Sequence, residues 1–230
     1  MSHVFVITDS MADFPIGALD RRRIKVVSFQ ATPDDILKTY KRVGPKILFL
    51  RASAKLNGVI QSAERAKEKV PFHFEVQILD SQTISLGLGF LAMRAVELAE
   101  DGMNLDTLEV EIKQLIPKVR LYGILSKDPS SFGSILHAKS IISIKNGEVT
   151  PVEKDRSKAK SLERLVEIAA GEGDMLKVGV IHAAAESEAK ELAKRLKLVY
   201  PGKHIPVVQT GTIIGTHSGP GLVGICGLLK

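Results

Sequence analysis

The chain has 230 residues, of which 44% are hydrophobic and 25% are charged, and its formal net charge is +6. These proportions are typical of a folded globular protein and exclude an intrinsically disordered chain. No apolar segment reaches the roughly 20 residues that a membrane-spanning helix requires. The N-terminus has no basic leader and reaches Asp9 early, which argues against a signal peptide. We expect a cytoplasmic protein with no stable membrane insertion.

The positive charge does not predict nucleic-acid binding. Aromatic residues make up only 5% of the chain, Trp is absent, and most Lys and Arg residues are interspersed with acids. The one basic run, at 21–25, reads as a solvated helix end. The single cysteine, Cys226, cannot form an internal disulfide, and it lies in the apolar run 222–229, so we expect a buried thiol. The histidines show no metal-ligand spacing, and we expect no metal site.

Short β-branched runs alternate with helical patterns in the first half. Strands are expected at 4–7, 25–27, 47–50 and 76–79, because these runs are apolar and short. Thr32 followed by Pro33 and two acids is a strong helix start. Further helices are expected at 58–69, at 89–100 (apolar almost all round, hence buried), and from the cap Asn104 to near 117. The alternation predicts a parallel sheet covered by helices.

The second half has a different pattern. Residues 141–149 predict a β-hairpin, because Asn146-Gly147 suits a type I′ turn. Helices are expected at 157–170 and 186–199, with strands at 178–182 and 205–208. Glu186 with Lys190 and Glu191 with Arg195 should pair on the exposed face of the last helix. We therefore predict an α/β protein of two lobes: an N-terminal parallel-sheet domain at 1–118 and a smaller C-terminal α/β domain with a hairpin at 119–230.

Small polar residues follow each of the four predicted strands of the first half. The closing segments are Thr8-Asp9-Ser10, Ser28-Phe29-Gln30, the stretch from Ser53 to Asn57-Gly58, and Asp80-Ser81. In a parallel sheet these segments share the carboxyl edge, where crevices form and helix N-termini point. The arrangement favours an anion-binding cleft. The alternative is that each residue only caps the helix that follows it.

A second cluster, Gly-Thr-His-Ser-Gly-Pro-Gly, occupies 215–221. Three glycines and a proline around His217 predict a constrained loop in which backbone amides and an imidazole can approach a ligand. The alternative interpretation is a turn before a last apolar strand, with an incidental histidine.

Taken in chain order, these segments resemble the DegV family of fatty-acid-binding proteins, which includes the FakB subunits of fatty acid kinase. The resemblance covers about 4–227. It rests on Ile7-Thr8-Asp9-Ser10, on the Ser-x-x-Leu-x-Gly-x-x-Gln-Ser-Ala stretch at 53–63, on Asp80-Ser81, and above all on the His-x-Gly-Pro-Gly motif at 217–221. The segment before the first loop is shorter than in the family, and the family's Gly-Gly-Arg motif is not recognisable at 125–139.

The resemblance implies a carrier without catalytic residues, cofactor or metal. One fatty acid, or a similar amphiphilic carboxylate, would lie in an apolar tunnel between the lobes, and a partner kinase would phosphorylate its exposed carboxylate. By match to the family motifs, the carboxylate-binding residues would be Ser28, Asn57, Gly58 and His217. An additional head-group loop would draw on Ser10, Ser53, Ser81, Thr216 and Gly219.

Two other hypotheses stay open. The first is an enzyme in which His217, near Asp9 or Asp80, acts as general acid or base on a small substrate. The second is a paralogue that keeps the fold while its pocket is occluded, with Phe29 as the plug.

Overall fold

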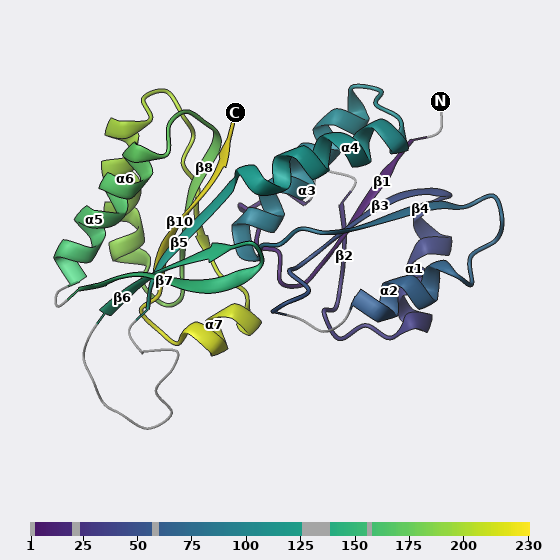
Figure 1. Ribbon diagram of the computed structural model, residues 1–230, viewed down its shortest axis with the longest axis horizontal. Helices are drawn as coiled ribbons and strands as arrows, with labels where there is room; N and C mark the ends of the chain where they lie inside the picture. The colour runs from purple at the N-terminus through teal and green to yellow at the C-terminus, as the bar shows by residue number, and fades with distance from the viewer. Residues whose placement is uncertain (1–2, 20–23, 57–59, 126–138, 156–157) are drawn as a thin grey trace. The chain divides into compact units, whose positions relative to one another are not determined.

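The computed structural model describes residues 3–19, 24–56, 60–125, 139–155 and 158–230 (Figure 1). The chain divides into two compact units. The first comprises Met1–Ile84, Leu88–Pro117 and Asn146–Glu148, and the second comprises Ser85–Gly87, Lys118–Lys145 and Val149–Lys230. Both units combine helices with a sheet, which confirms the predicted α/β class.

The first unit is built on a four-stranded parallel sheet. Its strands are β1 (Phe5–Asp9), β2 (Ile24–Val27), β3 (Lys46–Arg51) and β4 (Glu75–Asp80), in the order β2-β1-β3-β4. All three pairings are parallel, as the alternation of strands and helices predicts. The run Ile47 to Leu50 is fully buried, because a parallel sheet is covered on both faces.

Helices cover both faces of this sheet. Figure 1 shows α1 (Pro33–Val43) and α2 (Ile60–Lys67) on one side, and α3 (Ser85–Glu100) and α4 (Leu105–Leu115) on the other. A 3₁₀ turn, η1 (Ile116–Lys118), follows α4. On the side of α1 and α2, one apolar cluster forms against the sheet. Ile36, Tyr40 and Ala63 of the helices pack there against Ile7 and Phe49 of the strands. Burial of these apolar side chains is a favourable contribution to the stability of the unit.

The predicted helix starts are confirmed for α1 and α4. The Thr32 hydroxyl accepts from the Asp35 amide at 3.3 Å, and Pro33 is the first helical residue. The Asn104 side chain accepts from the Thr107 amide at 3.0 Å. Each cap satisfies an amide that the first turn of a helix leaves without a partner.

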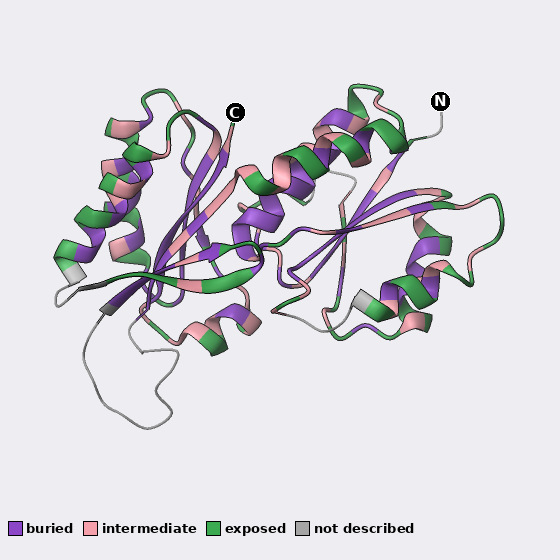
Figure 2. Cartoon of the chain, in the orientation of Figure 1, coloured by how far each residue is buried: buried purple, intermediate pink, exposed green. Residues whose placement is uncertain are grey.

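Helix α3 begins at Ser85, four residues before the predicted start at Gly89. Residues 85–93 are all buried (Figure 2). Tertiary packing therefore outweighs the low helix propensity of the glycines in this segment. An added Cβ at Gly89 would lie 2.0 Å from the Asp13 carbonyl oxygen, so only glycine allows this close approach.

The second unit contains a six-stranded mixed sheet in the order β7-β6-β5-β10-β8-β9. Its strands are β5 (Val119–Leu125), β6 (Lys139–Lys145), β7 (Glu148–Asp155), β8 (Met175–His182), β9 (Val207–Gln209) and β10 (Val223–Leu229). Strand β10 pairs antiparallel with β5 and β8, while β8 and β9 are parallel. At the turn between β6 and β7, Asn146 and Gly147 have φ values of 51° and 83°, as the hairpin prediction requires.

Two helices pack on one face of this sheet. They are α5 (Lys158–Gly171) and α6 (Glu186–Val199), and their buried faces carry Leu165 and Leu192 among others. Cys226 on β10 is buried, in agreement with the expectation from its apolar neighbours.

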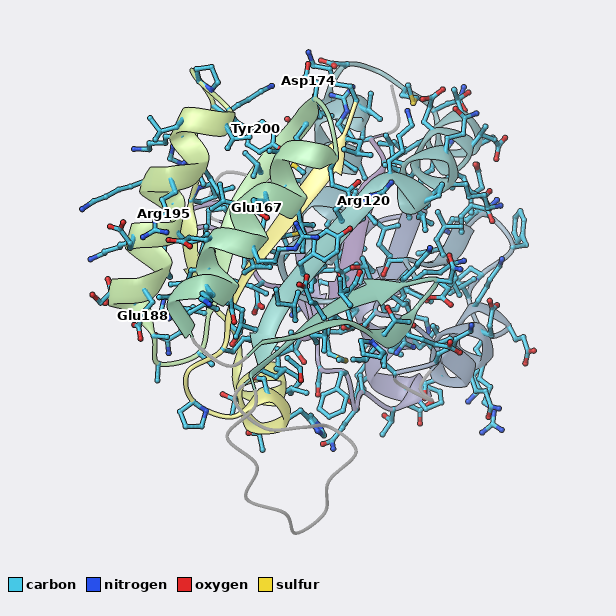
Figure 3. All side chains as sticks on the ribbon, turned by 60° about the vertical axis from the view of Figure 1, so that its left-hand side comes forward. Arg120, Glu167, Asp174, Glu188, Arg195 and Tyr200 are labelled. Carbon is cyan, nitrogen blue, oxygen red and sulfur yellow. The ribbon has the colours of Figure 1, made fainter. Side chains whose placement is uncertain are left out.

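Polar contacts link strands and helices in the second unit, and Figure 3 labels Arg120, Arg195 and Tyr200 among the residues that make them. Arg120 on β5 lies 2.6 Å from the carboxylate of Glu172, at the end of α5. Tyr122 donates to the same carboxylate. Burial of the Tyr122 hydroxyl, together with its hydrogen bond to Glu172, raises the pKa of Tyr122 to about 12. Tyr200, after α6, donates to the Ala169 carbonyl of α5. The predicted pairs on α6 are present, with Glu186 and Lys190 2.7 Å apart and Glu191 and Arg195 3.2 Å apart.

Two features of the second unit differ from the sequence prediction. Strand β5 lies in a segment for which the sequence analysis predicts no strand, and it pairs with both β6 and β10. The expected glycine-rich loop at 215–221 is partly a helix, α7 (Thr212–Ser218). The Gly215 amide donates to the Gly211 carbonyl at 2.9 Å, and the helix ends where Gly219 adopts a φ of 74°. Glycine therefore ends this helix rather than preventing it.

We predict that Gly89→Ala destabilises the protein by roughly 1–3 kcal/mol, a cost typical of overpacking. Ala normally favours a helix over Gly by about 1 kcal/mol, but here its methyl group would meet the Asp13 backbone. Urea unfolding measures the effect. Gly171→Ala is the matched control, because an added Cβ there meets no atom within 4 Å. Equal stability of the Gly89→Ala variant and the parent protein would contradict the packing argument.

We also predict that His182 makes the protein less stable in acid. Burial lowers the pKa of this imidazole, Lys190 acts in the same direction, and Glu186 and Glu188 oppose it. Its Nδ1 accepts from the Ala185 amide at 3.4 Å, which requires the neutral ring. A lowered folded-state pKa means that the unfolded chain binds more protons. Stability should therefore fall as pH drops through the unfolded value of about 6.5.

Urea unfolding at pH 7.5 and pH 5.5 tests this dependence. His182→Asn should lose less stability over this interval than the parent, because Asn can still accept from the amide but does not titrate. His204→Asn, at an exposed position, should leave the pH dependence unchanged. The interpretation is wrong if the parent and His182→Asn show the same slope.

Candidate functional site at the carboxyl edge of the parallel sheet

The four strands of the first sheet end on a common row. The register pairs Asp9 with Val27, Thr8 with Leu50, and Arg51 with Asp80. The residues that follow these positions therefore lie along one carboxyl edge, as the strand order requires. This edge is where ligands bind in open α/β sheets.

A buried ion pair lies at the centre of this row. The Asp9 carboxylate has no exposed surface, and the Arg51 side chain is 2% exposed, with its Nε 3.7 Å from Asp9 Oδ2. Asp9 Oδ1 also accepts from the Met11 amide at 3.0 Å, and Oδ2 accepts from the Ala52 amide at 2.9 Å. The Arg51 guanidinium lies 5.4 Å from the centroid of the Phe49 ring. Two amides and a cation thus compensate for the lost hydration of the carboxylate.

Arg51 is a site residue that the sequence prediction did not identify. Burial lowers the pKa of its guanidinium, and the neighbouring Asp9 carboxylate opposes that shift. The signal available in the sequence is a charged residue directly after the apolar run 47–50. Because a cation at that position normally marks the solvated end of a strand, only the register reveals its partner.

The four predicted serines of this edge fall into two groups. The Ser53 and Ser81 hydroxyls are fully buried and donate to backbone carbonyls: Ser53 to Gly147 at 2.7 Å and Ser81 to Thr83 at 3.2 Å. Ser10 is half-buried and Ser28 is exposed, and each accepts one amide, from Phe29 at 3.0 Å and from Gln30 at 3.2 Å respectively. Accepting an amide uses a lone pair and leaves the O–H of Ser10 and Ser28 able to donate to a ligand.

Two predicted residues of this loop system, Asn57 and Gly58, lie outside the described residues. Phe29, the predicted plug in the occluded-pocket hypothesis, is half-buried. Its backbone amide is the group that Ser10 binds. The structure therefore fixes the backbone of the β2–α1 loop at Phe29 against the end of β1.

The remaining predicted residues are on or beside α7, in the second unit. His217 is exposed in the last turn of this helix, and Gly219 follows as its C-terminal cap. The Thr216 hydroxyl donates to the Thr212 carbonyl at 2.7 Å. Its proton is therefore used in a hydrogen bond within the helix. Since these residues belong to the second unit and the serines to the first, their joint head-group role stays a prediction.

The described ranges also bear on other site chemistries. Within them, no three His, Cys, Asp or Glu side chains are grouped in a way that could hold a metal ion. Among the same residues, no helix combines the length and the apolar character that crossing a bilayer requires.

Comparisons with known proteins identify relatives over nearly the whole chain. The model of the DegV family, described as uncharacterised proteins, matches residues 28–230. A DegV domain-containing protein of Streptomyces coelicolor is 32% identical over an alignment of 275 residues, which covers 97% of each chain.

Solved structures with similar folds include two with described ligands or functions. DegV of Bacillus subtilis, described as a fatty acid binding protein, has a TM-score of 0.87 at 24% identity, with 100% of both chains covered. The fatty acid kinase (Fak) B3 protein of Streptococcus pneumoniae, solved with linoleic acid, has a TM-score of 0.85 at 15% identity, again over 100% of both chains. These similarities establish the fold. The family match and the Streptomyces relative show that the chain belongs to the DegV family.

Proposed function

We propose that this protein binds a long-chain fatty acid, or a similar amphiphilic carboxylate, and performs no chemistry on it. The observation that carries the proposal is its membership of the DegV family, together with a fold shared over the full chain with proteins described as fatty-acid-binding. The acyl chain would be enclosed by apolar side chains, at roughly 0.8 kcal/mol per buried methylene.

The head group would be held by uncharged donors and an imidazole. We assign this role to Ser28, Asn57, Gly58 and His217, with Ser10 as a further donor. The exposed Ser28 hydroxyl and the half-buried Ser10 hydroxyl each keep a proton to donate, which supports their assignment. Hydrogen bonds to a charged group contribute about 1.5–3 kcal/mol each. Ser53 and Ser81 hold backbone turns, so we give them a supporting part in the head-group loop.

The carrier hypothesis is favoured over an acid–base enzyme by the state of the two aspartates. Asp9 is buried, and both of its oxygens accept backbone amides. Asp80 Oδ1 accepts two amides. Asp9, with both oxygens occupied in a buried position, is therefore not arranged to exchange protons with a substrate, and Asp80 has one oxygen committed to the backbone. We further propose that the bound carboxylate is presented to a partner kinase, as the Fak name of the Streptococcus pneumoniae protein suggests.

We predict that the purified protein carries fatty acid. Denaturation, solvent extraction and mass spectrometry should identify a copurifying long-chain acid. Added oleate at 100 times its dissociation constant should stabilise the folded state by about 2.7 kcal/mol. For a chain of this size, this corresponds to a rise in Tm of roughly 5–10 °C. No copurifying lipid, together with no Tm shift across a panel of fatty acids, would overturn the proposal.

We predict that His217→Ala weakens oleate binding by about 10–100-fold, which is the loss of one hydrogen bond to a charged group. Fluorescence displacement or calorimetry measures the dissociation constant. His204→Ala is the matched control, because it removes another exposed imidazole from the same unit. If both variants bind as tightly as the parent protein, His217 does not contact the head group.

A further inference from the structure

Two carboxylates from neighbouring strands hold the backbone between β3 and α2. Asp9, at the end of β1, accepts from the Ala52 amide at 2.9 Å. Asp80, at the end of β4, accepts from the Ala54 amide at 3.2 Å. The two flanking strands of β3 therefore each supply one acceptor, and the two amides that they bind lie on either side of Ser53.

The two aspartates use their oxygens differently. One Asp9 oxygen accepts from the Met11 amide in its own turn, and the other accepts from the Ala52 amide. Asp80 accepts both the Gln82 amide, at 2.9 Å, and the Ala54 amide through the same atom, Oδ1. An asparagine at position 80 would keep that oxygen and both hydrogen bonds, because Asn has one amide oxygen with two lone pairs.

Backbone hydrogen bonds fix the ends of β3 and β4 to each other at the same place. The Ser81 amide donates to the Arg51 carbonyl at 2.9 Å, and the Ser53 amide donates to the Thr83 carbonyl at 2.9 Å. The segment from Arg51 to Ala54 is thus attached at three points to the end of β4 and the residues that follow it. The last of these attachments is a side-chain contact, so it is the one that a substitution can remove.

We propose that Asp80 is a positioning residue for the head-group loop, acting through the Ala54 amide and not through its charge. This inference rests on the proposed function, because the turn held by Asp80 contains Ser53, to which that proposal gives a supporting part in the head-group loop. Since Asp9 and Asp80 occupy the Ala52 and Ala54 amides, these two amides orient the loop and do not bind the ligand. Loss of the hydrogen bond between the Ala54 amide and Asp80 would displace the start of the loop. The affinity for a carboxylate ligand would then fall.

Two substitutions separate geometry from charge. Asp80→Asn removes the charge and keeps the acceptor in place, whereas Asp80→Glu keeps the charge and moves the acceptor by one methylene. Asp106→Asn and Asp106→Glu, on the exposed first turn of α4, are the matched controls. Dissociation constants are measured for oleate and for oleyl alcohol, which has the same chain length without the carboxylate. Hydrogen exchange of the Ala54 and Ala52 amides, followed by NMR, gives a readout that needs no ligand.

We expect Asp80→Glu to weaken oleate binding about tenfold and oleyl alcohol binding less than twofold. Its Ala54 amide should exchange at least tenfold faster, while the Ala52 amide, held by Asp9, should exchange at the parent's rate. Asp80→Asn and both control variants should match the parent protein in every readout. Parent-like exchange and affinity in Asp80→Glu would overturn the inference. So would an equal loss for acid and alcohol, or a larger loss in Asp80→Asn than in Asp80→Glu.

Failure of the proposed function gives a different result. If the parent protein binds neither oleate nor oleyl alcohol, the fatty-acid proposal fails. Exchange at Ala54 then decides by itself whether Asp80 positions the turn: faster exchange in Asp80→Glu alone supports that role, and unchanged exchange refutes it.

Discussion

The carboxyl edge of the first sheet depends on the buried contact between Asp9 and Arg51. A carboxylate without exposed surface is tolerated only where donors or an opposite charge replace its hydration. Here the Met11 and Ala52 amides donate to Asp9, and the Arg51 guanidinium supplies the opposite charge. Removing one partner of such a pair typically costs about 3–5 kcal/mol, because the other charge stays buried. The ends of β1 and β3 are therefore held in a single arrangement, and the loops beyond them start from fixed positions.

This fixed edge explains why chemically similar serines differ in what they can do. Ser53 donates its proton to the Gly147 carbonyl in the turn between β6 and β7, and Ser81 donates its proton to the Thr83 carbonyl of its own turn. All four hydroxyls accept a backbone amide, but the protons of Ser10 and Ser28 have no acceptor among the described residues. Donation of the hydroxyl proton to a backbone carbonyl thus separates the two serines that stabilise turns from the two that we propose as ligand donors. Residue type alone does not carry that information.

The fold was predictable from the sequence where local signals agree with the tertiary structure. Thr32 and Pro33 start a helix in any context that tolerates one, and Asn146-Gly147 favours the hairpin turn that the structure contains. The strand β5 was missed because Gly123 interrupts its apolar run, although Leu121 and Ile124 are buried on either side. Helix α7 was missed because it has two turns and a central glycine; burial of Ile214 accompanies it, where propensity alone would not support a helix.

The candidate site was less predictable, because register and burial decide it. The sequence indicates that polar residues follow four strands, and the parallel order places them on one edge. It does not indicate that Arg51 turns inward to Asp9, since a cation at a strand end is ordinarily solvated. Nor does it indicate which amides the aspartates occupy. These facts follow from the pairing of β1, β3 and β4, which brings together residues 43 and 26 positions apart in the chain.

The charge of this row limits how an anionic head group can be bound near it. Asp9 and Asp80 contribute two negative charges and Arg51 one positive charge, so the row has no net positive charge to offer a carboxylate. The Arg51 guanidinium is buried against Asp9 and Phe49, and it is committed to the fold. Affinity for an anion at this edge must therefore come from short-range, uncharged donors such as hydroxyls and amides. Because salt screens long-range attraction between exposed charges but affects such hydrogen bonds little, the proposed selection of the ligand would depend on the geometry of the loops that Asp9 and Asp80 hold.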